Sequence, residues 1–239
     1  NISNIQLLIS ELEDVSSLSL RENTGIAAAQ NKGFAELYKQ GFSWAVLLDQ
    51  DSEFMAVGVA KYLFEINRRS DNQIGLVAPR YVDRNRDRNI NHDDSVFEVE
   101  FPIASGTMIN VLAWHEVGGM DEKLFIDRVD DDFDLRLRNS GYKLLQISSV
   151  YLLHNIGDIS TIRLGPWKVN IFNHNAIRKY YIARNAVLFS KKHGDFRDAA
   201  QRIVVLIAKV ILFEKNKHQK LRSICVGVGD GLTNKGGRY

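Results

Sequence analysis

The feature that most constrains this chain is a short apolar run that ends in two acidic residues. Residues 45–48 read Ala-Val-Leu-Leu, and Asp49, Gln50 and Asp51 follow directly. The run predicts a buried strand, so the acidic side chains would lie at the carboxyl edge of a sheet, where open α/β sheets bind ligands. Carboxylates at that edge can hold a hard divalent cation that also takes the phosphate oxygens of a substrate. The pattern therefore predicts a site for a phosphorylated ligand.

Helix patterns and strand patterns alternate along the first two thirds of the chain. Alternation of this kind is typical of an α/β fold, and we expect a mixed, mainly parallel sheet flanked by helices. Apolar spacing predicts strands over residues 43–48, 74–78, 96–101, 104–109 and 142–153, and helices over residues 24–40, 55–69, 111–117 and 130–139.

The composition is that of an ordinary soluble protein, with 45% hydrophobic and 25% charged residues. Cys225 is the single cysteine, so the chain has no disulfide framework and a reducing cytoplasm is the expected setting. We expect Cys225 to be an unreactive thiol rather than a nucleophile. No apolar run reaches the roughly 18 residues that a membrane span requires.

The charge changes sign along the chain, which suggests two parts. Residues 1–160 carry a net charge of −10, whereas residues 161–239 hold 16 Lys and Arg against 4 Asp and Glu, a net charge of +12. We expect a catalytic domain over 1–160 and a basic C-terminal helical region over 161–239, with helices at 174–192 and 196–214 and an irregular glycine-rich segment at 226–237. The basic surface could face nucleic acid, an anionic membrane or a pyrophosphate, or it could simply be solvated. Nucleic acid is the least favoured partner, because no aromatic platform is interleaved with the basic residues.

A second acidic segment lies near the expected helix at 130–139. It places five carboxylates in eight positions, at residues 127, 130, 131, 132 and 134. One or two would serve to cap a helix, but five crowded carboxylates raise one another's pKa, which is how a general base is tuned.

His154, at the end of a predicted strand, could be a metal ligand, a phosphate contact or a structural residue.

Several further motifs accompany these two acidic segments in a fixed order. The set is Asn-Thr-Gly-Ile-Ala-Ala-Ala-Gln-Asn-Lys-Gly at 23–33, Leu-Leu-Asp-Gln-Asp-Ser at 47–52, Ala-Ser-Gly-Thr at 104–107, Val-Gly-Gly-Met-Asp-Glu-Lys-Leu-Phe-Ile-Asp at 117–127, Val-Asp-Asp-Asp-Phe-Asp-Leu-Arg at 129–136, Gly-Tyr at 141–142, His-Asn-Ile-Gly at 154–157 and Tyr-Tyr-Ile-Ala-Arg-Asn at 180–185. Together they resemble the family 2 glycosyltransferases of the GT-A fold. Within that family the chain is most similar to bacterial rhamnosyltransferases that build cell-surface polysaccharide, and the resemblance covers essentially its whole length.

The resemblance implies a sugar-nucleotide site around the first acidic segment. Asp51 matches the family's ligand of Mg²⁺ or Mn²⁺, Asp49 matches a ribose or metal contact, and His154 completes the expected metal set. The family's nucleotide pocket matches Asn23, Gly25 and Asn31, and the floor of its sugar-phosphate site matches Ser105 and Gly106.

The resemblance also selects a catalytic base in the second acidic segment. The family's base lies six residues before an Arg and eleven before a Gly-Tyr pair, which selects Asp130, with Arg136 and Gly141 at the later positions. Asp132 is the second choice, because this chain has Val129-Asp130 at the position where members of the family have Glu-Asp. Arg136 joins the expected sugar-nucleotide contacts.

The expected function is that of an inverting, metal-dependent transferase that moves rhamnose from dTDP-rhamnose to a lipid-linked glycan. The apolar stretch 203–213 and the basic C-terminal region predict peripheral attachment to the inner membrane face, although the stretch could equally pack in a core. A homo-oligomer is compatible with the sequence.

Two alternatives remain open. The family's fold begins with a strand, a helix and a second strand, of which Asn1–Asn4 resembles the end, so about 35 to 45 residues would be missing, close to one βαβ unit. A non-catalytic protein that binds sugar nucleotides is therefore the first alternative. A metal-dependent phosphohydrolase ranks lower, because no Lys matches the one that such enzymes need.

Overall fold

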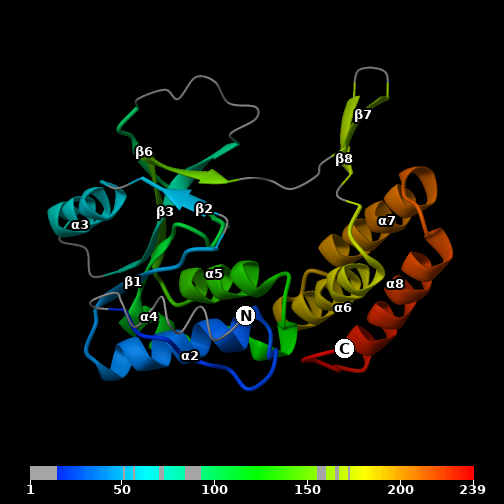
Figure 1. The fold of residues 1–239 in the computed structure, drawn as a ribbon, viewed down its shortest axis with the longest axis horizontal. Helices are drawn as coiled ribbons and strands as arrows, with labels where there is room; N and C mark the ends of the chain where they lie inside the picture. Colours follow the sequence, from blue (N-terminus) through cyan, green and yellow to red (C-terminus); the bar gives the residue numbers. More distant parts are fainter. Residues whose placement is uncertain are drawn as a thin grey trace.

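The computed structural model describes residues 15–50, 52–55, 57–69, 73–83, 93–154, 160–164, 167–171 and 173–239. It describes only the backbone of Asp83, His154 and the segments 160–164 and 167–171. One sheet with helices on both faces forms one side of the molecule, and a group of C-terminal helices forms the other (Figure 1). The chain is therefore of the α/β class.

The main sheet is mixed, with the order β1-β5-β3-β6-β2 and β4 paired beside β2 on β6. Its strands are β1 (Trp44–Val46), β2 (Ser52–Phe54), β3 (Ile74–Asp83), β4 (Val96–Glu98), β5 (Met108–Asn110) and β6 (Lys143–His154). Strands β1, β3 and β6 run in one direction, and β2, β4 and β5 run in the other. The expected mixed sheet is thus confirmed, but the expected parallel majority is not seen, because β3–β6 is the one parallel pairing among the described strands.

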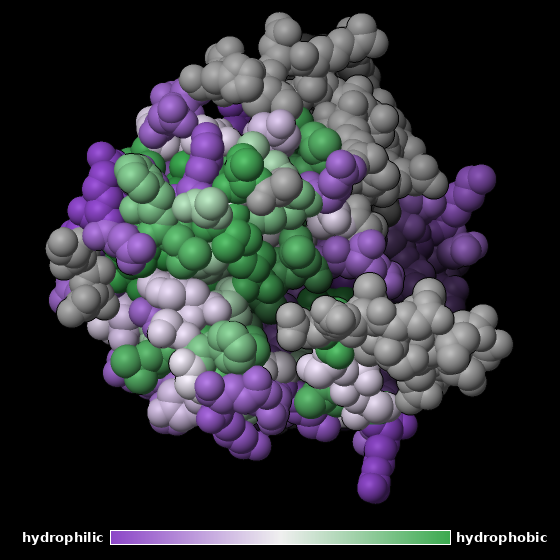
Figure 2. Space-filling model, turned by 60° about the vertical axis from the view of Figure 1, so that its left-hand side comes forward, coloured by the Kyte–Doolittle hydropathy of each residue, from purple (hydrophilic) through white to green (hydrophobic). Residues whose placement is uncertain are grey.

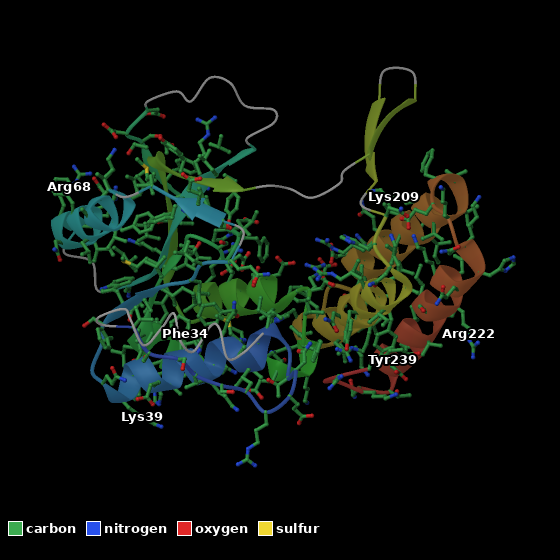
Figure 3. All side chains as sticks on the ribbon, in the orientation of Figure 1. Phe34, Lys39, Arg68, Lys209, Arg222 and Tyr239 are labelled. Carbon is green, nitrogen blue, oxygen red and sulfur yellow. The ribbon has the colours of Figure 1, made fainter. Side chains whose placement is uncertain are left out.

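Helices cover both faces of this sheet, because successive side chains of a strand point to opposite faces and each face carries apolar residues that must be buried. Leu76 and Ala78 of β3 pack on one face against α2, α4 and α5, whereas Val77 packs on the other face against Tyr62 of α3. Phe34 points from α2 into the first of these cores (Figure 3). The helices on this side are α2 (Ile26–Lys39), α3 (Gly58–Arg69), α4 (Val111–Glu116), the 3₁₀ turn η1 (Glu122–Leu124) and α5 (Val129–Asn139).

Glycines end the helices where the sequence predicts a stop. Gly41 and Gly141 follow α2 and α5 with φ values of +79° and +86°, a backbone conformation that only glycine adopts without strain. Strand β3 is longer than expected, since it continues past Pro79 to Asp83 with a register shift between Pro79 and Arg80.

The C-terminal region contains three long helices and a hairpin. They are α6 (Ala176–His193), α7 (Phe196–Phe213), α8 (Lys217–Leu232) and the hairpin of β7 (Ser160–Leu164) and β8 (Trp167–Ile171). The division into domains at residue 160 stays a prediction. None of the helices in the described part of the chain is long and apolar enough to cross a membrane.

The expectation of irregular structure at 226–237 is wrong for residues 226–232, which belong to α8, whereas residues 233–237 lie beyond its end. Gly227 and Gly231 lie on the side of α8 that faces α6. A methyl group at Gly227 would overlap the carbonyl oxygen of Tyr180, and one at Gly231 would lie 2.7 Å from Cβ of Val187. The glycines therefore allow two helix backbones to approach closely, and this contact outweighs their low helix propensity.

Candidate functional site

The segment after β1 carries Asp49 to the turn that precedes β5. The N–H of Leu47 donates to the carbonyl of Thr107 at 3.0 Å, and the N–H of Gly106 donates to the carbonyl of Leu47 at 2.7 Å. One step further, the N–H of Asp49 donates to Oγ of Ser105 at 3.1 Å. Three of the expected donor-site residues, Asp49, Ser105 and Gly106, are thus neighbours in the fold.

Two tyrosine hydroxyls hold the Ser105–Gly106 turn. The hydroxyl of Tyr62 donates to the carbonyl of Gly106 at 2.9 Å, and that of Tyr81 donates to the carbonyl of Ser105. Gly106 has φ +78°, and a side chain there would meet Pro79 at 2.8 Å. Sequence reasoning missed both tyrosines. Tyr62 could have been found as an inward-facing polar residue of the helix at 55–69, but no local signal marks Tyr81.

Asp130 lies in the first turn of α5 and faces the same turn. Its carboxylate is partly exposed and hydrogen-bonds to the backbone of Ala104, next to Ser105. Burial and the neighbouring charges of Asp131, Asp49 and Asp127 raise the pKa of Asp130 to about 6, against the hydrogen bond from Ala104. Burial and the charges of Asp49 and Asp130 likewise raise the pKa of Tyr81. The structure therefore brings Asp49 and Asp130, which are far apart in sequence, to one place.

Asp134 follows Asp130 by one helical turn and is almost fully buried. Its Oδ2 has no hydrogen-bond partner, and it lines the same small cavity as Asp130, beside Phe133. Burial, together with the charges of Asp130 and Asp131, raises the pKa of Asp134 well above its ordinary value. Asp134 is thus a buried acid with a raised pKa, behind the partly exposed carboxylate of Asp130.

Asp132 and Arg136 turn to the other side of α5. Asp132 is fully buried, and its carboxylate accepts from Nε of Arg136, Nζ of Lys192 and Nε2 of His193, each at 2.8 Å. Burial alone would raise the pKa of Asp132, but these partners outweigh it and hold the pKa below its ordinary value. The roles expected for Asp132 and Arg136 stay predictions, and the structure places both away from Asp49.

The other nitrogens of Arg136 are also engaged by the protein. Nη1 donates to the carbonyl of Val117 at 2.5 Å, and Nη2 donates to the carbonyl of Gly119 at 2.6 Å. Arg136 therefore ties α5 to the end of α4, and a contact with a ligand would compete with these bonds.

The expected nucleotide-pocket residues separate into two positions. Asn31 donates to the carbonyl of Met120 and accepts from its N–H, at 2.9 and 2.7 Å, so its amide connects α2 to the turn after α4. Asn23 is exposed and accepts from the N–H of Gly25 at 3.0 Å. Gly25 begins α2 with φ +89° and packs against Phe125 in the loop before α5. Asn23 and Gly25 thus lie near that loop, while Asn31 is occupied by protein partners.

The expected metal site is only partly visible. Asp51 lies outside the described residues, and so does the side chain of His154, although the backbone of His154 pairs with Ser52, next to Asp51. Within the described residues no group of three potential ligands occurs. Of the expected ligands, Asp49 is the one whose side chain is described, and its exposed carboxylate is a donor that Mg²⁺ and Mn²⁺ accept, so the metal site stays a prediction.

A large pocket lies elsewhere, at the other end of β1. It has a volume of about 670 Å³ and is lined by Tyr38, Phe42, Trp44, Ile66 and Leu112 with several uncharged neighbours. Apolar surface gathers on this side of the molecule (Figure 2). No titratable carboxylate or histidine lines the pocket, so it lacks the groups that the chemistry at Asp49 and Asp130 would need.

Comparison with known proteins points to the class of enzyme. The chain is similar to dTDP-rhamnosyl transferase RfbF of Shigella flexneri, with 29% identity over 254 residues, covering 97% of this chain and 83% of the relative. No protein-family model matches the chain. Similarity over nearly the whole chain supports an enzyme that is a rhamnosyltransferase-like glycosyltransferase.

Proposed function

We propose that the chain transfers rhamnose from dTDP-rhamnose to a hydroxyl group of a glycan and inverts the anomeric configuration. The observation that carries the proposal is that Asp49 and Asp130 both hydrogen-bond to the segment Ala104–Ser105 and interact electrostatically. The name of the similar Shigella protein favours dTDP-rhamnose as the donor.

In this proposal Asp130 is the general base. A carboxyl with a pKa of about 6 is largely ionised at neutral pH, yet it binds a proton more strongly than an ordinary carboxylate does. Asp130 would accept the proton of the acceptor hydroxyl while that oxygen bonds to the anomeric carbon and the bond to the nucleoside diphosphate breaks. A single displacement of this kind inverts the configuration.

The turn at 104–107 would form the floor of the donor site. Ser105 is buried, and its Oγ donates to Oγ of Ser52 at 2.9 Å while it accepts from Asp49. Tyr62 and Tyr81 fix the two carbonyls of the turn, so its backbone is held before the donor arrives. Preorganisation of this kind lowers the cost of orienting the donor.

Asp49 and Asp51, with His154, would hold Mg²⁺ or Mn²⁺ in this proposal. When bound, the ion would neutralise the charge that develops on the departing diphosphate. Asp49 is exposed and lies at the sheet edge, where a donor can reach it.

The test is a transfer assay with dTDP-rhamnose, Mn²⁺ and rhamnose-accepting glycans, read by mass spectrometry of the product and NMR of its anomeric proton. We expect an inverted product with Mn²⁺ and none after chelation, with activity restored by added Mn²⁺ or Mg²⁺. Cleavage of simple phosphoesters without an acceptor would instead indicate a phosphohydrolase. Donor binding without transfer to any acceptor would indicate a non-catalytic sugar-nucleotide-binding protein.

We further propose that the acceptor is lipid-linked and that α7 attaches the protein to the inner face of an anionic membrane. One face of α7 exposes apolar residues that no described residue covers, and basic residues flank it. Val204 and Leu212 are both 64% exposed, and Val205 and Ile211 are 45% and 47% exposed. Arg197, Arg202 and Lys215 lie exposed along the same helix and just beyond its end. An apolar stripe with flanking cations has the chemistry of a helix that lies in the surface of an anionic bilayer.

A further inference from the structure

The 123–128 loop, which comprises the end of η1 and the segment that leads to α5, holds an unusual backbone conformation. Phe125, Asp127 and Arg128 have φ values of +62°, +69° and +63°. Residues with side chains rarely adopt this region, and such conformations persist where the surrounding structure imposes them. The loop ends where α5 begins, two residues before Asp130, so its shape determines where Asp130 points.

Asn185 of α6 supplies much of the support for this loop. The residue is fully buried, and its Nδ2 lies within hydrogen-bond distance of the carbonyls of Leu124, Ile126 and Asp127, at 2.7, 2.6 and 2.9 Å. Its Oδ1 accepts from Nε of Arg184 at 3.0 Å, which fixes the orientation of the amide. One side chain therefore binds three backbone carbonyl groups of the loop.

Arg184 supports the start of the same loop. Its buried guanidinium donates through Nη2 to the carbonyls of Lys123 and Leu124, at 3.0 and 3.1 Å, and through Nη1 to the carbonyl of Gly237 at 2.6 Å. The C-terminal tail packs beside this contact, since the N–H of Gly237 donates to the carbonyl of Lys123 at 2.8 Å and the ring of Tyr239 packs on that of Tyr180.

The loop also touches the donor side of the site. The N–H of Ile26, at the start of α2, donates to the carbonyl of Phe125 at 2.8 Å, and Gly25 allows Phe125 to pack against the same segment. A shift of the loop would therefore move both the first turn of α5 and the segment around Asn23.

We propose that Asn185, oriented by Arg184, is a positioning residue for the reaction, because it holds the 123–128 loop in the conformation that directs Asp130 toward the Ser105–Gly106 turn. The inference deepens the proposed function and rests on the role of Asp130 as base. It gives the Arg184-Asn185 pair of α6 a part in catalysis without contact with the substrate.

The experiment compares Asn185→Asp and Arg184→Lys with the wild-type chain. Asn185→Asp keeps the shape of the side chain and the oxygen that accepts from Arg184. It replaces the N–H donors that bind the three loop carbonyls with a second oxygen, which cannot donate to them. Arg184→Lys keeps the charge and loses the forked donors. Val210→Ala is the matched control, because Val210 is fully buried in the C-terminal helices and packs in a cluster that contains no residue of the loop.

Hydrogen exchange of the amides is measured first. We expect exchange of residues 123–130 to become at least about tenfold faster in both loop variants while α8 keeps its protection, since the lost donors face the loop and the carbonyl of Gly237 in the tail and not α8. Val210→Ala should raise exchange within the C-terminal helices and leave the loop unchanged. Unchanged exchange at 123–130 in Arg184→Lys would overturn the inference, even if Asn185→Asp fails to fold.

Steady-state transfer and dTDP binding are measured on the same proteins. We expect kcat to fall by about 10²-fold, the loss that a small misplacement of a reacting group can cause, with the Kd for dTDP changed by less than about threefold. A fall of kcat in Val210→Ala as large as in the loop variants would contradict a positioning role. If the wild-type chain transfers no sugar, the proposed function fails, while the exchange data still decide whether Asn185 holds the loop.

Discussion

At the scale of single residues, environment separates carboxylates that the sequence places side by side. Asp130 and Asp132 are two positions apart on α5 and therefore point in different directions. Asp132 has three cationic or imidazole partners and a lowered pKa, whereas Asp130 lies near other carboxylates and has a raised one. Two acids with divergent surroundings can take different roles, and here the geometry favours Asp130 as base and Asp132 as a structural anchor.

Replacing Asp130 with Asn should remove transfer and leave donor binding intact. The loss of a general base costs about 10²- to 10⁴-fold in kcat, and the amide keeps the size of the side chain. The measurement is kcat from the transfer assay together with the Kd for dTDP-rhamnose. Glu36→Gln is the matched control, since Glu36 is a surface carboxylate on α2 that pairs with Lys39, and its activity should change by no more than several-fold. A fully active Asp130→Asn enzyme would exclude Asp130 from the role.

At the scale of elements, α5 and α8 show how packing overrides local preference. The first turns of α5 carry several acids, of which Asp134 lies in the core without a partner for one oxygen. Helix α8 contains glycines that would weaken an isolated helix, yet two of them lie at the contact with α6. In both helices, position in the tertiary fold decides the effect of a residue.

Replacing Asp134 with Asn should stabilise the protein at neutral pH. The pKa of Asp134 is higher in the folded state than in the unfolded state, so its contribution to the free energy of unfolding decreases as pH rises above the unfolded value near 4. Removing the titration should raise Tm at pH 7.5, by about 2–4 °C for each 1 kcal/mol gained. The gain should disappear near pH 3, where the carboxyl is largely protonated in both states. An equal gain at both pH values would show that titration is not its cause.

The glycines of α8 provide a matched pair of substitutions. Gly227→Ala should destabilise the protein by about 1–3 kcal/mol, because the added methyl group overlaps the backbone of α6. Gly229→Ala should stabilise it by about 0.5–1 kcal/mol, because nothing lies within 4 Å of the added methyl group and Ala favours the helix. Urea denaturation measures both. Destabilisation of similar size in the two variants would show that close packing against α6 is not the reason for Gly227.

At the scale of the whole molecule, the C-terminal helices take part in both the proposed positioning of Asp130 and the proposed membrane attachment. Helix α6 contacts the loop that leads to Asp130, and α7, which packs on α6, exposes an apolar face. A chain arranged in this way could bring a membrane-bound acceptor to a base whose position depends on the same group of helices.

Substituting Val204 and Leu212 with Ser should weaken binding to vesicles that contain anionic phospholipid. Each side chain is largely exposed, and burying two such groups in a bilayer surface contributes enough free energy for a loss of at least about tenfold in affinity. Co-sedimentation with vesicles measures the change, and added salt should weaken binding further. Ile177→Ser is the control, because Ile177 is 55% exposed on α6 and lies outside the α7 face. Vesicle binding that the double substitution leaves unchanged would contradict membrane attachment through α7.

The sequence by itself determined the order of most helices and strands and the acidic groups available for chemistry. Periodicity and helix-ending glycines act over a few residues, so they can be recognised without the fold; Gly41 and Gly141 are examples. The buried strand expected over 43–48 is wrong in extent, since β1 covers only Trp44–Val46, is half-buried, and leaves Leu48 54% exposed. Only the tertiary structure decided that Asp130 meets Asp49, that Asp132 and Arg136 turn away, and that Tyr62 and Tyr81 hold the turn between them. It also decided that Gly227 lies inside a helix and that Asn185 supports the loop before α5. Each of these depends on contacts between distant segments, which local patterns do not encode.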